Sequence, residues 1–348
     1  MNAFFVSILN AIHSVVNNYG WTIVVFTVLI RLVLMPLDYK SRKGMRKMTA
    51  LSAKQAELQR KYGNDKEKLN RKLGELYKKE GVTPMSGCVP MLIQWPILII
   101  MFGAMREMTN TQTVNQVFQY LIHPDVVPAM DSWLWIKNVW QPDSLFQSVV
   151  PSARNLQIID LNVWRTVFEG LAPEAQNAIT SFINGSGGTL DFASKDTIQV
   201  IINALSTTEA YKSCMATVPG WTNVQALFFS FSVYQQWNGL LLLPALAAGT
   251  QILMNKLNPS QAGAAPTAAS SDQQQQQAST GKIMMIIFPL MSVYFCLISN
   301  AGFAIYWVTS NIVMGIMTVA MNNYLEKKDA QDPNWDKKKR VSSEGSVK

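Results

Sequence analysis

The chain contains five apolar stretches, each close to the length of a membrane-spanning helix. They cover residues 21–37, 88–105, 237–255, 283–300 and 301–320. A helix needs about 20 mostly apolar residues to cross the hydrocarbon core of a bilayer, and about 17 is the lower limit. Only 15% of the 348 residues are charged, against about 25% in an average soluble domain. The sequence therefore predicts an all-α integral membrane protein with five transmembrane helices.

The first stretch, WTIVVFTVLIRLVLMPL, carries an arginine inside it. Its eleven Leu, Ile, Phe and Val residues each favour insertion by roughly 0.3–0.6 kcal/mol, and Arg31 opposes it by roughly 2.5–3.5 kcal/mol. The stretch is predicted to insert into the membrane. A polar or charged partner should then accept hydrogen bonds from the guanidinium. Thr27 lies one turn earlier on the same face. The alternative is that Arg31 snorkels, because Leu37 is only about 9 Å away along a helix.

The charges of the connecting segments predict the topology. Residues 38–87 carry 14 basic and 6 acidic residues, whereas residues 106–236 carry 6 basic and 10 acidic residues. Residues 256–282 and 321–348 have net charges of +1 and +2. Because cytoplasmic loops of membrane proteins are enriched in Lys and Arg, these three segments are expected in the cytoplasm. The N-terminus and residues 106–236 are then expected outside, and the C-terminus inside.

The segments outside the apolar stretches differ in character. Residues 1–20 have apolar side chains at helical spacing, which predicts an amphipathic helix in the membrane interface, with a disordered N-terminus as the alternative. Residues 38–87 predict a basic antiparallel helical hairpin that turns at Gly63 and Asn64 and ends at Gly81. Its charge suits either solvation near anionic lipids or a platform for the ribosome or a targeting receptor.

Residues 106–236 are predicted to form an ordered, mainly helical extracytoplasmic region that includes an insert at 144–236. The insert has no motif that explains it, and we expect a helical cap that receives folding substrates or binds another envelope protein. The low-complexity loop 256–282 and the charged tail 321–348 are predicted to be disordered.

The sequence lacks the common signatures of catalysis. It contains no P-loop, HExxH or GxSxG pattern, and its two histidines, His13 and His123, are too few for a histidine-built metal site. Its three cysteines imply no disulfide framework. An SxxK string at Ser279 and Lys282 falls in the low-complexity loop. We therefore predict no enzyme activity, no metal and no cofactor.

Polar groups inside the apolar stretches are the candidate functional residues, because such groups in membrane spans usually face a polar interior. Gln94 lies between Pro90 and Pro96, and Ser299, Gly302, Tyr306 and Ser310 recur on one helix face with Trp307 beside them. Each has a structural alternative: Gln94 could make a packing hydrogen bond, Ser310 could bond its own helix, and Tyr306 and Trp307 could be interface anchors.

Five strings along the chain resemble, in order and spacing, the YidC/Oxa family of membrane-protein insertases. They are TVLIRLVLMPLDYKS, YGNDKEKLN…LYKKEGVTPMSGCVPMLIQWPI, LLPALAAGTQIL, IIFPLMSVYF and NAGFAIYWVTSN. The resemblance implies five helices around a hydrophilic groove that is open to the cytoplasm and to lipid. It places Arg31 and Thr27 in that groove, with Gln94, Trp95, Tyr306 and Trp307 at groove or gate positions. To these the shared helix face adds Ser310.

The chain departs from the family pattern at two informative places. Asn300 stands where the family usually has a proline, so the hairpin between the last two spans is expected to be less rigid. The insert at 144–236 replaces a short link, and the resemblance does not cover it.

The resemblance implies a function without nucleotide hydrolysis. Nascent membrane proteins would enter the groove, meet water and Arg31, and leave laterally into the bilayer. The implied partners are nascent substrates, membrane lipids, and the ribosome and a targeting receptor through the hairpin and tail, with the Sec translocon as a further option. The location is the bacterial plasma membrane. The alternatives are a channel or transporter with Arg31 as an anion site, and a chaperone that folds membrane proteins without inserting them.

Overall fold

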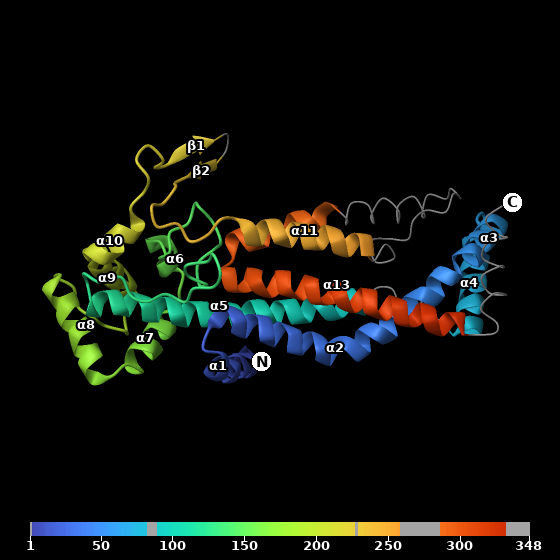
Figure 1. The fold of residues 1–348 in the computed structure, drawn as a ribbon, viewed down its shortest axis with the longest axis horizontal. Coiled ribbons are helices and arrows are strands. Elements are labelled where there is room, and N and C mark those ends of the chain that lie inside the picture. Colours follow the sequence, from blue (N-terminus) through green and yellow to red (C-terminus); the bar gives the residue numbers. More distant parts are fainter. Residues whose placement is uncertain (1, 82–88, 227–228, 258–285, 332–348) are drawn as a thin grey trace. The chain divides into compact units, whose positions relative to one another are not determined.

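The computed structural model of the chain describes residues 2–81, 89–226, 229–257 and 286–331, and these residues are mostly helical (Figure 1). The chain divides into two compact units. Unit 1 comprises Met1–Phe26, Ile99–Leu246 and Val293–Trp307, and unit 2 comprises Thr27–Leu98, Ala247–Ser292 and Val308–Lys348. The prediction of a mostly helical fold is confirmed, and one short pair of strands is added to it.

The helices follow the order of the predicted segments. They are α1 (Asn2–Val16), α2 (Tyr19–Ala50), α3 (Ser52–Tyr62), α4 (Lys66–Glu80), α5 (Val89–Ile122), α6 (Ala153–Gln157), α7 (Leu161–Glu169), α8 (Pro173–Gly185), α9 (Asp196–Leu205), α10 (Glu209–Met215), α11 (Leu242–Leu257) and α13 (Ala301–Ala330). A further apolar helix covers Ile286–Ile298. Strands β1 (Val224–Ala226) and β2 (Phe229–Phe231) form an antiparallel hairpin.

Two helices of the described residues are long and apolar enough to cross a membrane. These candidate spans are Tyr19–Gly44 in α2 and Ala301–Lys328 in α13. On α2 the side chains of Leu29, Leu32 and Val33 are 49%, 50% and 78% exposed, whereas Arg31 is 4% exposed. A helix in water would show the reverse distribution. Apolar residues outside and polar residues inside indicate that lipid surrounds this helix.

Several helices extend beyond the predicted spans. Helix α2 continues through Pro36 to Ala50, so the basic hairpin consists of α3 and α4 alone. Helix α5 runs from Val89 to Ile122, well past residue 105, because its second half is buried in a core that it shares with α7, α9 and α10. Helix α13 continues ten residues beyond 320, to Ala330. The low-complexity residues 258–282 and the tail residues 332–348 lie outside the described residues.

The third predicted span begins later than expected. Residues 237–241 are not helical, and α11 starts at Leu242. The cause is the buried carboxylate of Asp143, which accepts hydrogen bonds from the backbone N–H of Leu241 at 3.1 Å and of Leu243 at 2.6 Å. Gly239 makes this possible, because a Cβ there would lie 2.0 Å from the Asp143 Oδ1 atom. Asp143 thus caps the start of α11.

The insert packs on the second half of α5. One cluster of buried residues joins Val114, Val117 and Phe118 of α5 to Trp164 of α7 and Ile201 of α9. Phe118 and Trp164 meet edge to face, with ring centroids 5.8 Å apart. Five helices, α6 to α10, lie in the insert. Its core is shared with α5, however, so the insert does not form a core from its own residues alone.

The apolar face of helix α1 packs against other parts of the protein. Leu9 of this face is fully buried, and the Phe5 ring lies 6.0 Å from the Phe26 ring of α2. Two apolar side chains point outward instead, with Phe4 65% and Val15 84% exposed. The amphipathic helix is therefore present, and its position in the membrane interface stays a prediction.

Candidate functional site

The candidate site is built on one polar stripe of α2. Thr27, Arg31, Asp38 and Arg42 lie at spacings of four, seven and four residues, which keeps them within about 60° of arc at 3.6 residues per turn. Thr27 is fully buried, and Arg31 and Arg42 are 4% and 9% exposed. Asp38 is close enough to interact electrostatically with both arginines. The stripe thus places two buried guanidinium groups and one half-buried carboxyl group on one face of α2.

Helix α13 supplies the acceptors for this stripe. The Arg31 Nε atom donates to the Ser310 hydroxyl at 2.9 Å, and its Nη2 atom donates to the same oxygen. The Arg42 Nη2 atom donates to the Thr318 hydroxyl. The Arg46 Nη1 atom donates to the Asn322 carbonyl oxygen at 3.3 Å. Ser310 and Thr318 are both buried. Within unit 2, two buried hydroxyl groups thus accept hydrogen bonds from two guanidinium groups.

These bonds also give the relative direction of the two helices. Later residues of α2 pair with later residues of α13, so the helices run parallel in this part of unit 2. Helix α11 lies beside α13 on another side (Figure 1). There the Asn311 amide donates to the Thr250 hydroxyl at 3.2 Å, and Gly315 would place a Cβ 3.4 Å from the Met254 sulfur. Polar contacts thus join three apolar helices.

The other predicted site residues are distributed as follows. Tyr306 lies one turn before Ser310 on α13 and is 2% exposed. Within unit 1 its ring lies 6.2 Å from that of Phe303, and the Trp307 ring lies 5.9 Å from the same ring. Gln94 and Trp95 fall inside α5, but their side chains lie outside the described residues. The structure therefore brings Arg31 and Ser310 together, with Thr27 one turn away.

Sequence reasoning missed three members of the site, which are Asp38, Arg42 and Thr318. Asp38 and Arg42 fall in the segment predicted to form the hairpin, because the apolar run ends at Leu37. Repeating the spacing of Thr27 and Arg31 eleven residues later, which is about three helical turns, would have identified both. Thr318 follows Ser310 by eight residues, close to two helical turns, and the same extension along α13 would have indicated it.

Asn300 has a structural role that the sequence did not indicate. Its side-chain oxygen accepts from the Phe303 N–H at 2.8 Å and caps α13, while its amide nitrogen donates to the Thr109 hydroxyl at 2.8 Å. The backbone of Ala301 and Gly302 donates to Gln141 and Val139. Asn300 thus fixes the start of α13 by bonds that a proline in this position could not make.

The basic hairpin is compact. Leu51 and Leu69 are buried, Asp65 caps α4 by accepting from the Lys68 N–H at 3.0 Å, and Gly81 ends α4 with a φ of 61°. Lys54 and Glu80 form an ion pair at 2.9 Å. The hydrogen bond from Lys72 lowers the pKa of Glu75. The predicted turn and the predicted end at Gly81 are confirmed.

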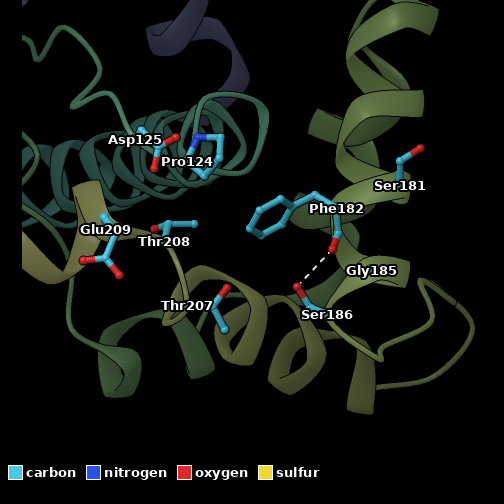
Figure 2. A pocket seen from close by; sticks show the side chains of 9 residues that line it. All are labelled: Pro124, Asp125, Ser181, Phe182, Gly185, Ser186, Thr207, Thr208 and Glu209. Carbon is cyan, nitrogen blue, oxygen red and sulfur yellow. Dashed lines mark hydrogen bonds between the residues drawn. The ribbon is translucent and has the colours of Figure 1, made fainter.

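A hollow of about 520 Å³ lies in unit 1 (Figure 2). Its lining consists of Pro124, Asp125, Ser181, Phe182, Gly185, Ser186, Thr207, Thr208 and Glu209. Glu209 is ion-paired with Lys212 at 2.8 Å, and the Ser186 hydroxyl donates to the Phe182 carbonyl at 3.0 Å. The hollow is open and has polar and apolar surface in similar amounts, and the polar stripe of α2 remains the stronger candidate site. Among the described residues no cluster of His, Cys, Asp and Glu could hold a metal ion.

Taken together, the apolar helices and the buried arginines define a helical membrane protein with a positively charged centre. A family model described as 60Kd inner membrane protein matches residues 11–328. Because this covers most of the chain, the protein belongs to the family of 60Kd inner membrane proteins.

Individual relatives carry the name "Membrane protein insertase YidC". The protein from Fusobacterium nucleatum is 34% identical over 146 residues, which cover 42% of this chain and 62% of that protein. The protein from Campylobacter jejuni is 44% identical over 110 residues, or 32% and 21% of the two chains. The protein from Thioalkalivibrio sulfidiphilus is 43% identical over 100 residues, or 29% and 18%. The chain thus matches less than two thirds of the length of each of these relatives.

Proposed function

We propose that the protein is a membrane-protein insertase that moves polar segments of nascent membrane proteins past Arg31. The observation that carries the proposal is the Arg31 guanidinium, 4% exposed and bonded to the Ser310 hydroxyl between helices whose outward faces are apolar. A permanent charge at such a place costs free energy, so its presence indicates a function. Membership of a family whose relatives are named insertases supports the same reading.

The proposed mechanism exchanges the partner of Arg31. At rest the guanidinium donates to the neutral oxygen of Ser310. A carboxylate is a stronger acceptor than a hydroxyl group, so an acidic or polar tail of the substrate replaces Ser310 and moves into a hydrophilic groove formed by Thr27, Arg31 and Ser310. This lowers the cost of bringing polar groups into the apolar layer. Gln94, Trp95, Tyr306 and Trp307 are proposed to line the path in which the substrate segment lies.

The apolar part of the substrate supplies the driving force. Burial in lipid is worth about 25 cal/mol per Å² of apolar surface, so a hydrophobic segment leaves the groove sideways without nucleotide hydrolysis. The proposed topology has five spans, the N-terminus outside and the C-terminus in the cytoplasm of a bacterial cell. The parallel course of α2 and α13 supports it, because a first and a fifth span must cross in the same direction.

The proposed partners follow from charge and location. Nascent membrane proteins are the substrates, and lipids surround the bundle. The basic hairpin of α3 and α4, together with the charged tail, is proposed to contact the ribosome or a targeting receptor, and the outer region is available to other envelope proteins. Cooperation with the Sec translocon is compatible with this arrangement.

The test is reconstitution of the purified protein in liposomes with a nascent single-span substrate that has an acidic translocated tail. We expect protease-protected, inserted substrate with the parent protein and a strong loss with Arg31→Ala. The matched control is Val33→Ala, because Val33 is 78% exposed toward lipid on the same helix. A protein that carries anions across the same liposomes without inserting substrate would instead be a channel or transporter with Arg31 as its anion site.

A further inference from the structure

The charge pattern of the outer region changes abruptly at Lys212. Residues 144–212 carry ten charged side chains, but no Asp, Glu, Lys or Arg stands between Lys212 and Lys256. The uncharged stretch contains the β1–β2 hairpin and continues into α11. A surface in water normally carries about 25–35% charged residues, whereas charged side chains are expensive next to lipid. The segment before α11 thus lacks charged side chains, as does α11 up to Lys256.

The hairpin has one aromatic face and one polar face. Val224 pairs with Phe231, and Gln225 pairs with Ser230, so successive residues alternate between the two faces. The Phe231 ring lies 4.8 Å from the ring of Phe146 and 6.4 Å from that of Trp221. Trp221 is 49% exposed and Phe146 38% exposed. We call Phe146, Trp221 and Phe231 the aromatic patch.

We propose that the aromatic patch inserts into the outer interface of the lipid bilayer and anchors the insert to the membrane. Trp and other amphipathic aromatic side chains concentrate at the level of the lipid headgroups. The hairpin stands apart from the helices α6 to α10 (Figure 1), and the chain that leaves it reaches α11, where Leu242 and Leu246 are 41% and 44% exposed. Trp221 and Phe231 thus lie in the segment that leads into α11, where large apolar side chains are exposed.

This proposal depends on the membrane placement of α11 and not on insertase activity, so the two can fail separately. Adjacent residues on opposite faces of β1 provide the test. A nitroxide label is attached to Val224→Cys or Gln225→Cys in full-length protein whose three native cysteines are replaced by alanine. The protein is placed in vesicles of phosphatidylcholine and phosphatidylglycerol. Accessibility to oxygen, which is enriched in lipid, is compared with accessibility to a water-soluble nickel chelate.

We expect the ratio of oxygen to nickel accessibility to be severalfold higher at position 224 than at position 225. Labels that are equally accessible to nickel would overturn the proposal, because the hairpin would then stand in water. Spin–spin broadening at position 224 would overturn it in favour of a contact with a second copy. Labels shielded from both reagents without broadening would do so in favour of a protein partner.

A second measurement needs no label. The fluorescence of Trp221 is obtained as the difference between the parent protein and Trp221→Phe, in vesicles with and without brominated acyl chains. We expect bromine to quench this difference signal. The matched control is Trp164→Phe, because Trp164 is fully buried in the core of the insert and its signal should be unaffected. Quenching of Trp221 by aqueous iodide but not by brominated lipid contradicts the proposal.

Discussion

Replacement of Arg31 tests whether its charge acts on the substrate or only stabilises the fold of the protein. Arg31→Ala removes two hydrogen bonds to Ser310, and a hydrogen bond to a charged group contributes roughly 1.5–3 kcal/mol. It also removes an arginine that opposes insertion by roughly 2.5–3.5 kcal/mol. Two such bonds amount to roughly 3–6 kcal/mol, so removing the arginine offsets much of this loss. The variant should therefore still fold and enter the membrane, which a thermal melt in detergent or nanodiscs measures.

The effect on insertion should depend on the charge of the substrate. A carboxylate that is still about 8 Å from the guanidinium, before it replaces Ser310, gains about 2 kcal/mol at an effective dielectric constant of about 20, which corresponds to about thirtyfold in rate. We expect Arg31→Ala to slow the insertion of an acidic-tailed substrate by about that factor and that of a neutral-tailed substrate far less. Arg31→Lys should retain much of the activity, because a point charge remains at the same site.

The assay is a time course of protease protection in liposomes with two substrates that differ only in one acidic residue of the tail. An equal loss for both tails in a folded Arg31→Ala protein would refute the electrostatic reasoning, because Arg31 would then act through the structure alone. Full activity toward the acidic tail would refute it as well. High salt should diminish the difference between the tails, since the Debye length falls to about 3 Å at 1 M.

Three further predictions concern other parts of the molecule. Deletion of residues 52–80, which removes α3 and α4 but keeps the Arg46 bond to α13, should leave a membrane-embedded bundle that no longer supports insertion; normal insertion rates in liposomes would reduce the hairpin to a solvated loop. Asp143→Ala should lower the midpoint of thermal unfolding more than Asp143→Asn, because it leaves three donors, among them the Trp135 indole, without their acceptor at roughly 1–3 kcal/mol each. Burial raises the pKa of Tyr211 to about 12, so the folded protein holds the phenolic proton more tightly than the unfolded chain, whose tyrosines titrate at about 10. The contribution of Tyr211 to stability should be constant below pH ~10 and be lost as the pH rises toward 12, and Tyr211→Phe should weaken the pH dependence in this window in thermal melts followed by circular dichroism.

Local sequence rules predicted the elements whose stability is itself local. The helical hairpin is an example, because Asp65 and Gly81 act on the residues next to them, and capping depends on residue type more than on distant contacts. The apolar stretches were recognisable for the same reason, since insertion into lipid depends on the composition of about 20 consecutive residues. Strands β1 and β2 were not predicted, because β-propensity depends strongly on the packing of the side chains.

Tertiary contacts fixed the features that the sequence did not predict. The start of α11 depends on Asp143, about a hundred residues earlier in the chain, and no window around Leu242 contains that information. The candidate site shows the same limit more sharply. Arg31 was detectable because a charge stands out in an apolar run, but Ser310 and Thr318 are small hydroxyl residues that are common in membrane helices. What distinguishes them is the hydrogen bond that each accepts from an arginine of α2. A polar stripe on one helix therefore predicts that acceptors exist, and only the packing of α2 against α13 shows which residues they are.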